Sequence, residues 1–153
     1  MVISTKDIQN LREETGLGVV DIKEALEKAK GDKKKALEIL SKKAGEKMEK
    51  KAGRVTSQGK IGAYVHGDGK SAVLVEVDCE TDFVAKNEGF VNFIKELTLQ
   101  IISMKPKDVK ELLGQSFIKD PSKTVEDLLK EIIAKTGENI VVKRFVVYQI
   151  GQD

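Results

Sequence analysis

Hydrophobic side chains recur at helical spacing in three short segments within the first 45 residues. Ser4 or Thr5 can cap the first segment, and Gly16 and Gly31 can end the first and second in a left-handed conformation. Asp32 can cap the third. The pattern predicts three helices whose apolar positions are Ile8 and Leu11, then Val19, Ile22, Ala25, Leu26 and Ala29, then Ala36, Leu37, Leu40 and Ala44. So small a bundle has a marginal core, which favours packing against another body.

The turn between the first two predicted helices is crowded with apolar side chains. Leu17, Val19 and Val20 follow one another closely there, beside Gly16 and Gly18. Not all three apolar side chains can easily point inward. The pattern leaves two interpretations open: an exposed apolar contact patch, or three ordinary core residues.

Residues 45–59 lack apolar periodicity and are interrupted by glycine and serine, which predicts a linker. We place a domain boundary near residue 55. The chain then divides into a three-helix domain with a basic linker, residues 1–55, and a single core domain, residues 56–153.

The second domain opens with the alternation of a β-hairpin. Three apolar residues on each predicted strand alternate with other side chains: Ile61, Ala63 and Val65, then Val73, Val75 and Val77, with Cys79 in phase with the valines. Between them, Gly67, Asp68 and Gly69 predict a three-residue loop.

The rest of the chain predicts two helices and a last strand. Helical spacing covers 90–101 and 125–133, Gly137 ends the second helix, and residues 140–150 are rich in β-branched and aromatic residues. Residues 105–121 hold both prolines and predict an irregular segment with one helical turn. The predicted fold is α+β: an N-terminal three-helix bundle, then a small antiparallel three-stranded sheet covered by helices.

Composition excludes several classes of protein. Of 153 residues, 40% are hydrophobic and 34% charged, which is typical of a globular chain with a charged surface and not of a disordered one. No run approaches the roughly 20 apolar residues of a membrane helix. The start of the chain lacks the features of a signal peptide. We expect a soluble, cytoplasmic protein with no membrane contact.

The basic stretch from Lys30 to Arg54 holds ten basic and four acidic residues. It has two interpretations: a nucleic-acid-binding module, or the solvated face of a helix. Glu38, Glu46 and Glu49 interrupt the stretch, and no aromatic residue is available to stack on bases. The helix face is favoured, so we expect no direct nucleic-acid contact and keep the binding module as the alternative.

Signals for catalysis or metal binding are weak. Cys79 could be paired with His66 as nucleophile and base, but its phase with three valines indicates a buried small hydrophobe. A lone cysteine and a lone histidine also exclude an internal disulfide and argue against a zinc site. The sequence contains no phosphate-binding glycine motif, so the protein is not expected to bind a nucleotide itself. We expect no enzyme activity and no cofactor.

Four acidic residues recur at every second position: Glu76, Asp78, Glu80 and Asp82. If the strand continued through all four, their carboxylates would share one face and could bind calcium or magnesium. The alternative is the solvated face of an antiparallel strand, which lacks the loop that wraps a cation. We favour the second interpretation and expect no metal site.

Residues 79–87 form an unusual strand-to-helix junction, in which Phe83 and Val84 stand within an acidic stretch. Such junctions turn over the protein surface. Phe83 can fold back as a lid on the core, or it can protrude as an aromatic wedge beside Asp82. The pattern alone does not decide between them.

Three segments in order along the chain resemble one family. They are residues 11–26, residues 137–145, and a hallmark-like segment, Glu80-Thr81-Asp82-Phe83-Val84-Ala85-Lys86-Asn87. Together they are similar to bacterial translation elongation factor Ts. The resemblance implies a ubiquitin-associated-like N-terminal bundle. It also implies a guanine nucleotide exchange factor that releases GDP from the GTPase elongation factor Tu.

The resemblance also assigns site residues. The segment matching Thr81, Asp82, Phe83 and Val84 dislodges the partner's magnesium ion in that family. Positions matching Arg12, Val19 and Val20 dock on the partner's GTPase domain; family members often carry methionine where the two valines stand.

Two departures from the family pattern bear on assembly. Longer members have two copies of the core and a coiled-coil insertion, whereas this chain has one core copy and the short segment 105–121. Some short members form homodimers, so a homodimer through the last strand is expected, without a disulfide because no cysteine lies near that strand.

Overall fold

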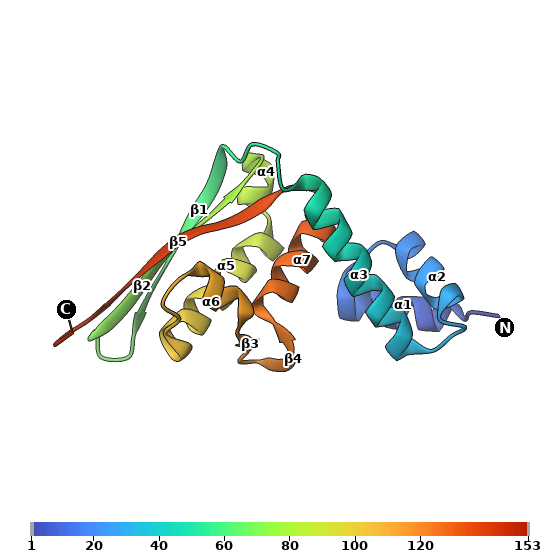
Figure 1. Cartoon of the computed structure of the whole chain (residues 1–153), viewed down its shortest axis with the longest axis horizontal. Coiled ribbons are helices and arrows are strands. Elements are labelled where there is room, and N and C mark those ends of the chain that lie inside the picture. The colour runs from blue at the N-terminus through green and yellow to red at the C-terminus, as the bar shows by residue number, and fades with distance from the viewer. Residues whose placement is uncertain (1, 153) are drawn as a thin grey trace.

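The structure, a computed structural model, describes residues 2–152. A three-stranded antiparallel sheet in the order β1-β2-β5 lies at one end of the molecule and three N-terminal helices lie at the other, with further helices between them (Figure 1). The elements in chain order are α1 Thr5–Thr15, α2 Val19–Lys28, α3 Lys33–Lys51, β1 Gln58–His66, β2 Ser71–Cys79, α4 Asp82–Ala85, α5 Glu88–Met104, α6 Val109–Gly114, β3 Ser116–Phe117, β4 Asp120–Thr124, α7 Val125–Thr136 and β5 Ile140–Gln149. The predicted α+β class is confirmed.

The three N-terminal helices form the predicted bundle. Ser4 caps α1, where its hydroxyl accepts a hydrogen bond from the backbone N–H of Asp7, and Gly16 ends α1 at a φ of 66°. Asp32 caps α3 in the same way. The core of the bundle is made of side chains from all three helices and the turn after α1: Leu11, Leu17, Ile22, Ala25, Leu26, Ala29, Ala36 and Leu40.

Helix α3 is longer than the sequence predicted, because it continues through Gly45 to Lys51. Ala44 is buried and Met48 packs against the core of the sheet, so the apolar spacing of Leu40 continues at every fourth residue. The ammonium of Lys47 also donates a hydrogen bond of 2.7 Å to Asp21 on α2. Residues 45–51 are therefore helical, and the linker prediction was wrong for them.

Helices α5 and α7 pack on one face of the sheet, as Figure 1 shows. The alternate residues Val73, Val75 and Val77 of β2 point into this core and are at most 1% exposed. A Cβ atom at Gly62 would lie 2.2 Å from Cγ2 of Ile94. Glycine at this position therefore lets α5 pack directly against β1.

The most apolar side chains of β1 point away from the core, and the alternate side chains face it. Tyr64 packs toward the helices, whereas Ile61 and Val65 are 61% and 63% exposed. The hairpin loop also differs from prediction: it has four residues, since His66 pairs with Ser71 across Gly67–Lys70. Gly67 and Gly69 do take positive φ values, of 52° and 83°.

Residues 105–124 are more ordered than predicted. They contain α6 and a second, two-stranded sheet, β3-β4. The buried amide of Gln100 organises this region: it donates hydrogen bonds to Gln115 and to the carbonyl of Ser116, and accepts one from the N–H of Ile118. Pro121 lies in the short strand β4, where a missing N–H is tolerated at an edge.

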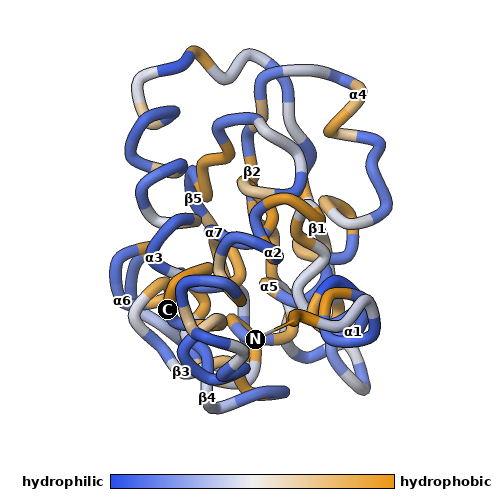
Figure 2. The backbone as a smooth tube through the Cα atoms, turned by 90° about the vertical axis from the view of Figure 1, so that its right-hand side faces the viewer, coloured by the Kyte–Doolittle hydropathy of each residue, from blue (hydrophilic) through white to orange (hydrophobic). Residues whose placement is uncertain are grey.

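The bundle packs on the rest of the chain mainly through α3 and α7, which lie side by side in Figure 1. Ala134 of α7 contacts the core of the bundle, and Met48 of α3 contacts the core of the sheet. Figure 2 shows α3 as a largely hydrophilic helix, in keeping with its many charged residues. No helix within residues 2–152 is long and apolar enough to cross a membrane.

Candidate partner-binding site

Phe83 stands out from the surface directly after the central strand. It lies on the one-turn helix α4, and 85% of its side chain is exposed. The interpretation of Phe83 as a lid on the core is therefore wrong. The neighbouring Asp82 is also exposed and pairs with Lys86 at 3.7 Å. An aromatic ring and a carboxylate thus project side by side from the junction.

The two flanking residues of this segment face the protein instead. Val84 is buried in the core of the sheet. Thr81 caps α4, with its hydroxyl accepting the N–H of Val84 at 3.4 Å. Of the four residues implied by the resemblance, Asp82 and Phe83 are free to touch another molecule, while Thr81 and Val84 fix them in place.

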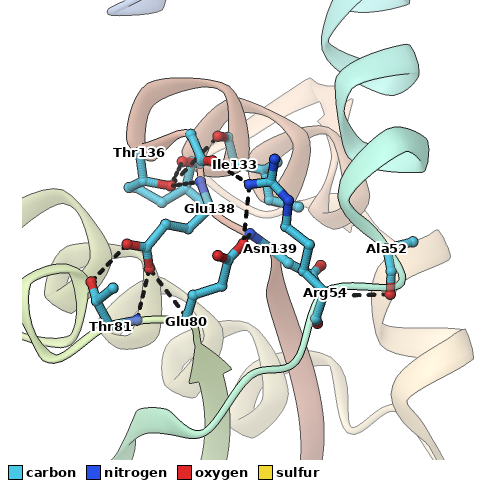
Figure 3. Close-up of polar contacts among 10 residues, drawn as sticks. Ala52, Arg54, Glu80, Thr81, Ile133, Thr136, Glu138 and Asn139 are labelled. Atoms are coloured by element: carbon cyan, nitrogen blue, oxygen red, sulfur yellow. Dashed lines mark hydrogen bonds and ion pairs between the residues drawn. The ribbon is translucent and has the colours of Figure 1, made fainter.

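Sequence reasoning assigned no role to Glu138 and Asn139, which the structure brings against this segment (Figure 3). The carboxylate of Glu138 binds the backbone and hydroxyl of Thr81, and Asn139 donates its N–H to the carboxylate of Glu80. We call Arg54, Glu80, Thr81, Glu138 and Asn139 the junction cluster. The resemblance of residues 137–145 to the same family was the one sequence signal that pointed here.

The second group of predicted contact residues lies in the helical bundle. Val19 and Val20 occupy the first turn of α2 and are 43% and 69% exposed, whereas Leu17 is buried. Each of the two interpretations of this turn is therefore correct for part of it: Leu17 is a core residue, and the two valines form a surface patch. Arg12 is exposed on α1. In Figure 1, α3 lies between these helices and α4, so the structure keeps the two groups apart.

The cysteine–histidine pair has no catalytic geometry. Cys79 is fully buried at the end of β2, and burial, followed by the nearby charge of Glu138, raises the pKa of its thiol. His66 lies at the other end of the hairpin, where it is exposed and contacts the Tyr64 hydroxyl at 3.1 Å. Cys79 is the buried small hydrophobe that its pattern indicated.

The four alternating acidic residues do not share one face, since β2 ends at Cys79. Glu76 binds Arg144 at 3.1 Å, Glu80 belongs to the junction cluster, and Asp82 lies on α4. Burial, and next the neighbouring Glu76, raise the pKa of Asp78. Within residues 2–152 no group of three or more histidine, cysteine or acidic side chains is placed to hold a metal ion.

Part of the basic stretch serves the packing of the bundle. Lys33 pairs with Glu14 at 2.7 Å, and Lys43 and Lys47 both bind Asp21. Their hydrogen bonds lower the pKa of the Asp21 carboxyl. These lysines are engaged with acidic partners on α1 and α2, which accords with a helix face that carries structural ion pairs.

The outer face of the sheet carries exposed apolar side chains from all three strands. They are Ile61 and Val65 on β1, Leu74 on β2, and Val146 and Tyr148 on β5. A hollow of about 240 Å³ opens among Ile61, Leu74 and Val146, with Glu76 and Arg144 beside it. We call these five apolar residues the outer sheet patch. Such a patch is typical of a surface that another molecule covers.

Comparison with known proteins points to one family. The family model described as "Elongation factor TS" matches residues 80–153. Proteins named "Elongation factor Ts" are similar over nearly the whole chain. The one from Thermoanaerobacter sp. strain X514 is 40% identical, covering 99% of this chain and 96% of its own. Those from Leptospira biflexa and Coprothermobacter proteolyticus are 41% and 40% identical, with 99% and 100% of their own lengths covered.

The alignments are longer than this chain. They span 196 or 197 positions against 153 residues here, so the relatives carry internal segments that this chain lacks.

Proposed function

We propose that this chain, which belongs to the elongation factor Ts family and is a translation elongation factor, acts as the nucleotide exchange factor for elongation factor Tu. In this proposal it binds the GDP-bound GTPase in the cytoplasm, dislodges the partner's magnesium ion and promotes GDP release. It performs no bond chemistry and needs no cofactor. The observation that carries the proposal is Phe83, which is 85% exposed on a segment matching the family's hallmark.

The aromatic ring supplies free energy only when the partner opens to receive it. Burying one phenylalanine side chain contributes about 1.5–3 kcal/mol, a ten- to hundredfold shift in an equilibrium. A contact made only in the opened state of the partner shifts the population toward that state. Magnesium bridges the phosphates to a GTPase, so displacing its protein ligands weakens the hold on GDP.

Asp82 adds a negative charge at the tip of the same segment. Its only ion pair within residues 2–152 is the long, exposed contact with Lys86, which contributes little and is easily given up. A carboxylate brought near the ion accepts a competing hydrogen bond from its hydroxyl or water ligands, or repels the phosphates. We assign Phe83 the wedge and Asp82 the electrostatic part of the displacement.

Arg12, Val19 and Val20 provide a second attachment, on the GTPase domain of the partner. Two attachments on one chain raise the local concentration of the wedge at the nucleotide site. Coupling is reciprocal: because the factor weakens nucleotide binding, a returning nucleotide weakens the factor's binding by the same ratio. The factor is thereby released and acts repeatedly.

We also propose that the chain forms a homodimer through the outer sheet patch. The patch is apolar and spans all three strands, with Glu76 and Arg144 offering charges of both signs beside it. A two-fold pairing would place each patch on its copy and supply the second core domain that longer family members carry within one chain.

The exchange function is tested with purified elongation factor Tu loaded with fluorescent GDP. Substoichiometric amounts of this protein are expected to accelerate GDP release manyfold. Phe83→Ala is expected to reduce the acceleration by about ten- to hundredfold because the buried ring is lost. Circular dichroism and thermal unfolding should be unchanged, since the ring is exposed.

Met104→Ala is the matched control. Met104 is half exposed at the far end of α5, and it should leave exchange unaltered. If Phe83→Ala exchanges as fast as wild type, Phe83 is not the wedge. If wild type itself fails to accelerate release, the proposed function is wrong.

A further inference from the structure

We propose that Glu138 is a positioning residue for exchange: its carboxylate holds the chain at Glu80 and Thr81 and so fixes the direction in which Phe83 projects. The inference rests on the proposed function and extends it to a residue outside the wedge. Glu138 lies just after α7, 57 residues along the chain from Thr81, and reaches the wedge only through the fold.

One carboxylate binds three donors at the base of α4. Its Oε1 accepts the backbone N–H of Glu80 at 3.1 Å and that of Thr81 at 3.0 Å. Its Oε2 accepts the Thr81 hydroxyl at 2.6 Å. Hydrogen bonds to an ionised acceptor are about twice as strong as neutral ones. The two residues before Asp82 lie beyond the last paired residue of β2, Cys79, and are held by this charged side chain.

A second hydrogen bond connects the same two segments with the donor and acceptor sides exchanged. The carboxylate of Glu80 accepts the backbone N–H of Asn139 at 2.6 Å. The end of β2 and the start of β5 thus each offer a carboxylate to the other's backbone, as Figure 3 shows. This double connection fixes the strand end from which α4 departs.

The cluster also includes the segment that leads from the helical bundle to the sheet. Asn139 is only 4% exposed, and its side-chain amide donates to the carbonyl of Arg54 at 2.9 Å. The Arg54 guanidinium donates hydrogen bonds to the carboxylate of Glu80 at 3.5 Å and to the carbonyl of Gly137 at 3.4 Å. The base of the wedge, the last strand and the connection to the docking helices therefore meet in one set of polar contacts.

Few other contacts fix the orientation of α4. It has four residues, too few for a helix to be stable on its own, and besides its cap at Thr81 it is anchored by the buried Val84 and the partly buried Ala85. Phe83 buries little surface of its own. Besides Val84 and the Thr81 cap, the polar bonds to Glu138 therefore help to fix where the ring points, and loosening them lets the ring sample directions in which it cannot enter the partner.

The experiment compares Glu138→Gln with wild type in the GDP-release assay over a range of factor concentrations. The amide keeps the size of the side chain but loses its charge and one acceptor oxygen. The maximal release rate is expected to fall about tenfold, the effect of losing roughly one charge-assisted hydrogen bond. The half-saturating concentration should change less than about twofold, because Arg12, Val19 and Val20 still dock.

Two further variants separate positioning from a general loss of stability. Glu126→Gln removes the same charge from α7 outside the junction cluster and should exchange like wild type. Phe83→Ala/Glu138→Gln should be no slower than Phe83→Ala, because Glu138 acts through the ring. If Glu138→Gln matches wild type, or slows the Phe83→Ala protein by the same factor, the inference is overturned.

Amide hydrogen exchange of the free protein reads the same contacts without the partner. In Glu138→Gln the backbone amides of Glu80 and Thr81 should exchange at least about tenfold faster, with the centre of β2 unchanged. Unaltered protection at these two amides would overturn the inference even if the exchange function holds. If the wild-type factor does not accelerate GDP release from elongation factor Tu, the proposed function fails. The amide result still decides whether Glu138 holds the segment.

Discussion

Val20 exposes 69% of its side chain in the first turn of α2, while Leu17, three residues earlier, is buried. An apolar side chain fixed on a rigid helix costs little entropy to bury against a partner. The same turn is an N-terminal one, where the exposed N–H groups favour a negative charge. A substitution by aspartate at this position therefore changes the surface and leaves the helix intact.

We predict that Val20→Asp weakens binding to GDP-bound elongation factor Tu by about tenfold, since an apolar contact is lost and a charge must be desolvated. Isothermal titration calorimetry measures the affinity. At saturating factor the GDP-release rate should match wild type, because the wedge is untouched. Val55→Asp, at an exposed valine outside the helices, serves as the control. Unchanged affinity for Val20→Asp would remove Val20 from the docking surface.

Phe83 and Val84 show what sequence can and cannot predict at this scale. The pattern located their segment as an apolar interruption of an acidic junction, yet it left open whether Phe83 was lid or wedge. A helix of four residues is too short for its periodicity to reveal an inner and an outer side. The residue just before α4 is also bound by Glu138, far along the chain, a tertiary contact that local pattern cannot show.

At the scale of elements, α2 and α3 are joined by Asp21, whose carboxylate binds Lys43 and Lys47. Hydrogen bonds from these lysines lower the pKa of Asp21 below its ordinary value of 3.8. A lowered pKa means that the folded state favours the ionised form. The stabilisation is therefore fully present above the ordinary value and is lost as the pH falls through the lower, folded value.

We predict that Asp21→Asn lowers the free energy of unfolding at pH 7 by about 1 kcal/mol, because both partners are partly solvated lysines. Urea unfolding at a series of pH values measures it. The difference from wild type should shrink below pH 3.8 and vanish at lower pH, where Asp21 itself is protonated. Glu49→Gln, at an exposed position on α3, should show no such change. A difference that persists in acid would assign the effect to packing and not to charge.

Regular elements were predictable where one apolar stripe repeats over several turns, as in α5 and α7. The end of α3 was missed because Gly45 and a run of charged residues hide the repeat from Leu40 to Met48. The sheet β3-β4 was missed because its order depends on the buried amide of Gln100, a tertiary contact. Strand β1 was recognised, but its alternation could not tell which side the helices cover.

At the scale of the whole molecule, one face of the three-stranded sheet is covered by α5 and α7 and the other carries the outer sheet patch. A patch of this kind is unfavourable in water unless it is covered. Leu74 lies on the central strand, within the hollow, and 46% of its side chain is exposed. A charge placed there disturbs any partner on this face more than it disturbs the monomer.

We predict that wild type sediments as a dimer at micromolar concentration and that Leu74→Glu sediments as a monomer, because two glutamates would be buried near the two-fold axis. Analytical ultracentrifugation distinguishes the two. Met104→Glu, at a methionine of similar exposure away from the patch, should remain dimeric. A monomeric wild type at tens of micromolar would show that the patch has another occupant or none.

Helix α3 is one uninterrupted rod that contacts both hydrophobic cores, the bundle through Leu40 and the sheet through Met48. Its 19 residues span about 28 Å at 1.5 Å per residue. Val20 belongs to the bundle at one end of α3, and Phe83 belongs to the sheet domain at the other. Because a helix shortens or bends very little, the separation between these two residues is set before the partner binds. Recognition of the partner then depends on the distance between its two binding surfaces as well as on their chemistry. A GTPase whose surfaces lie at the wrong distance can contact Val20 or Phe83, but not both at once.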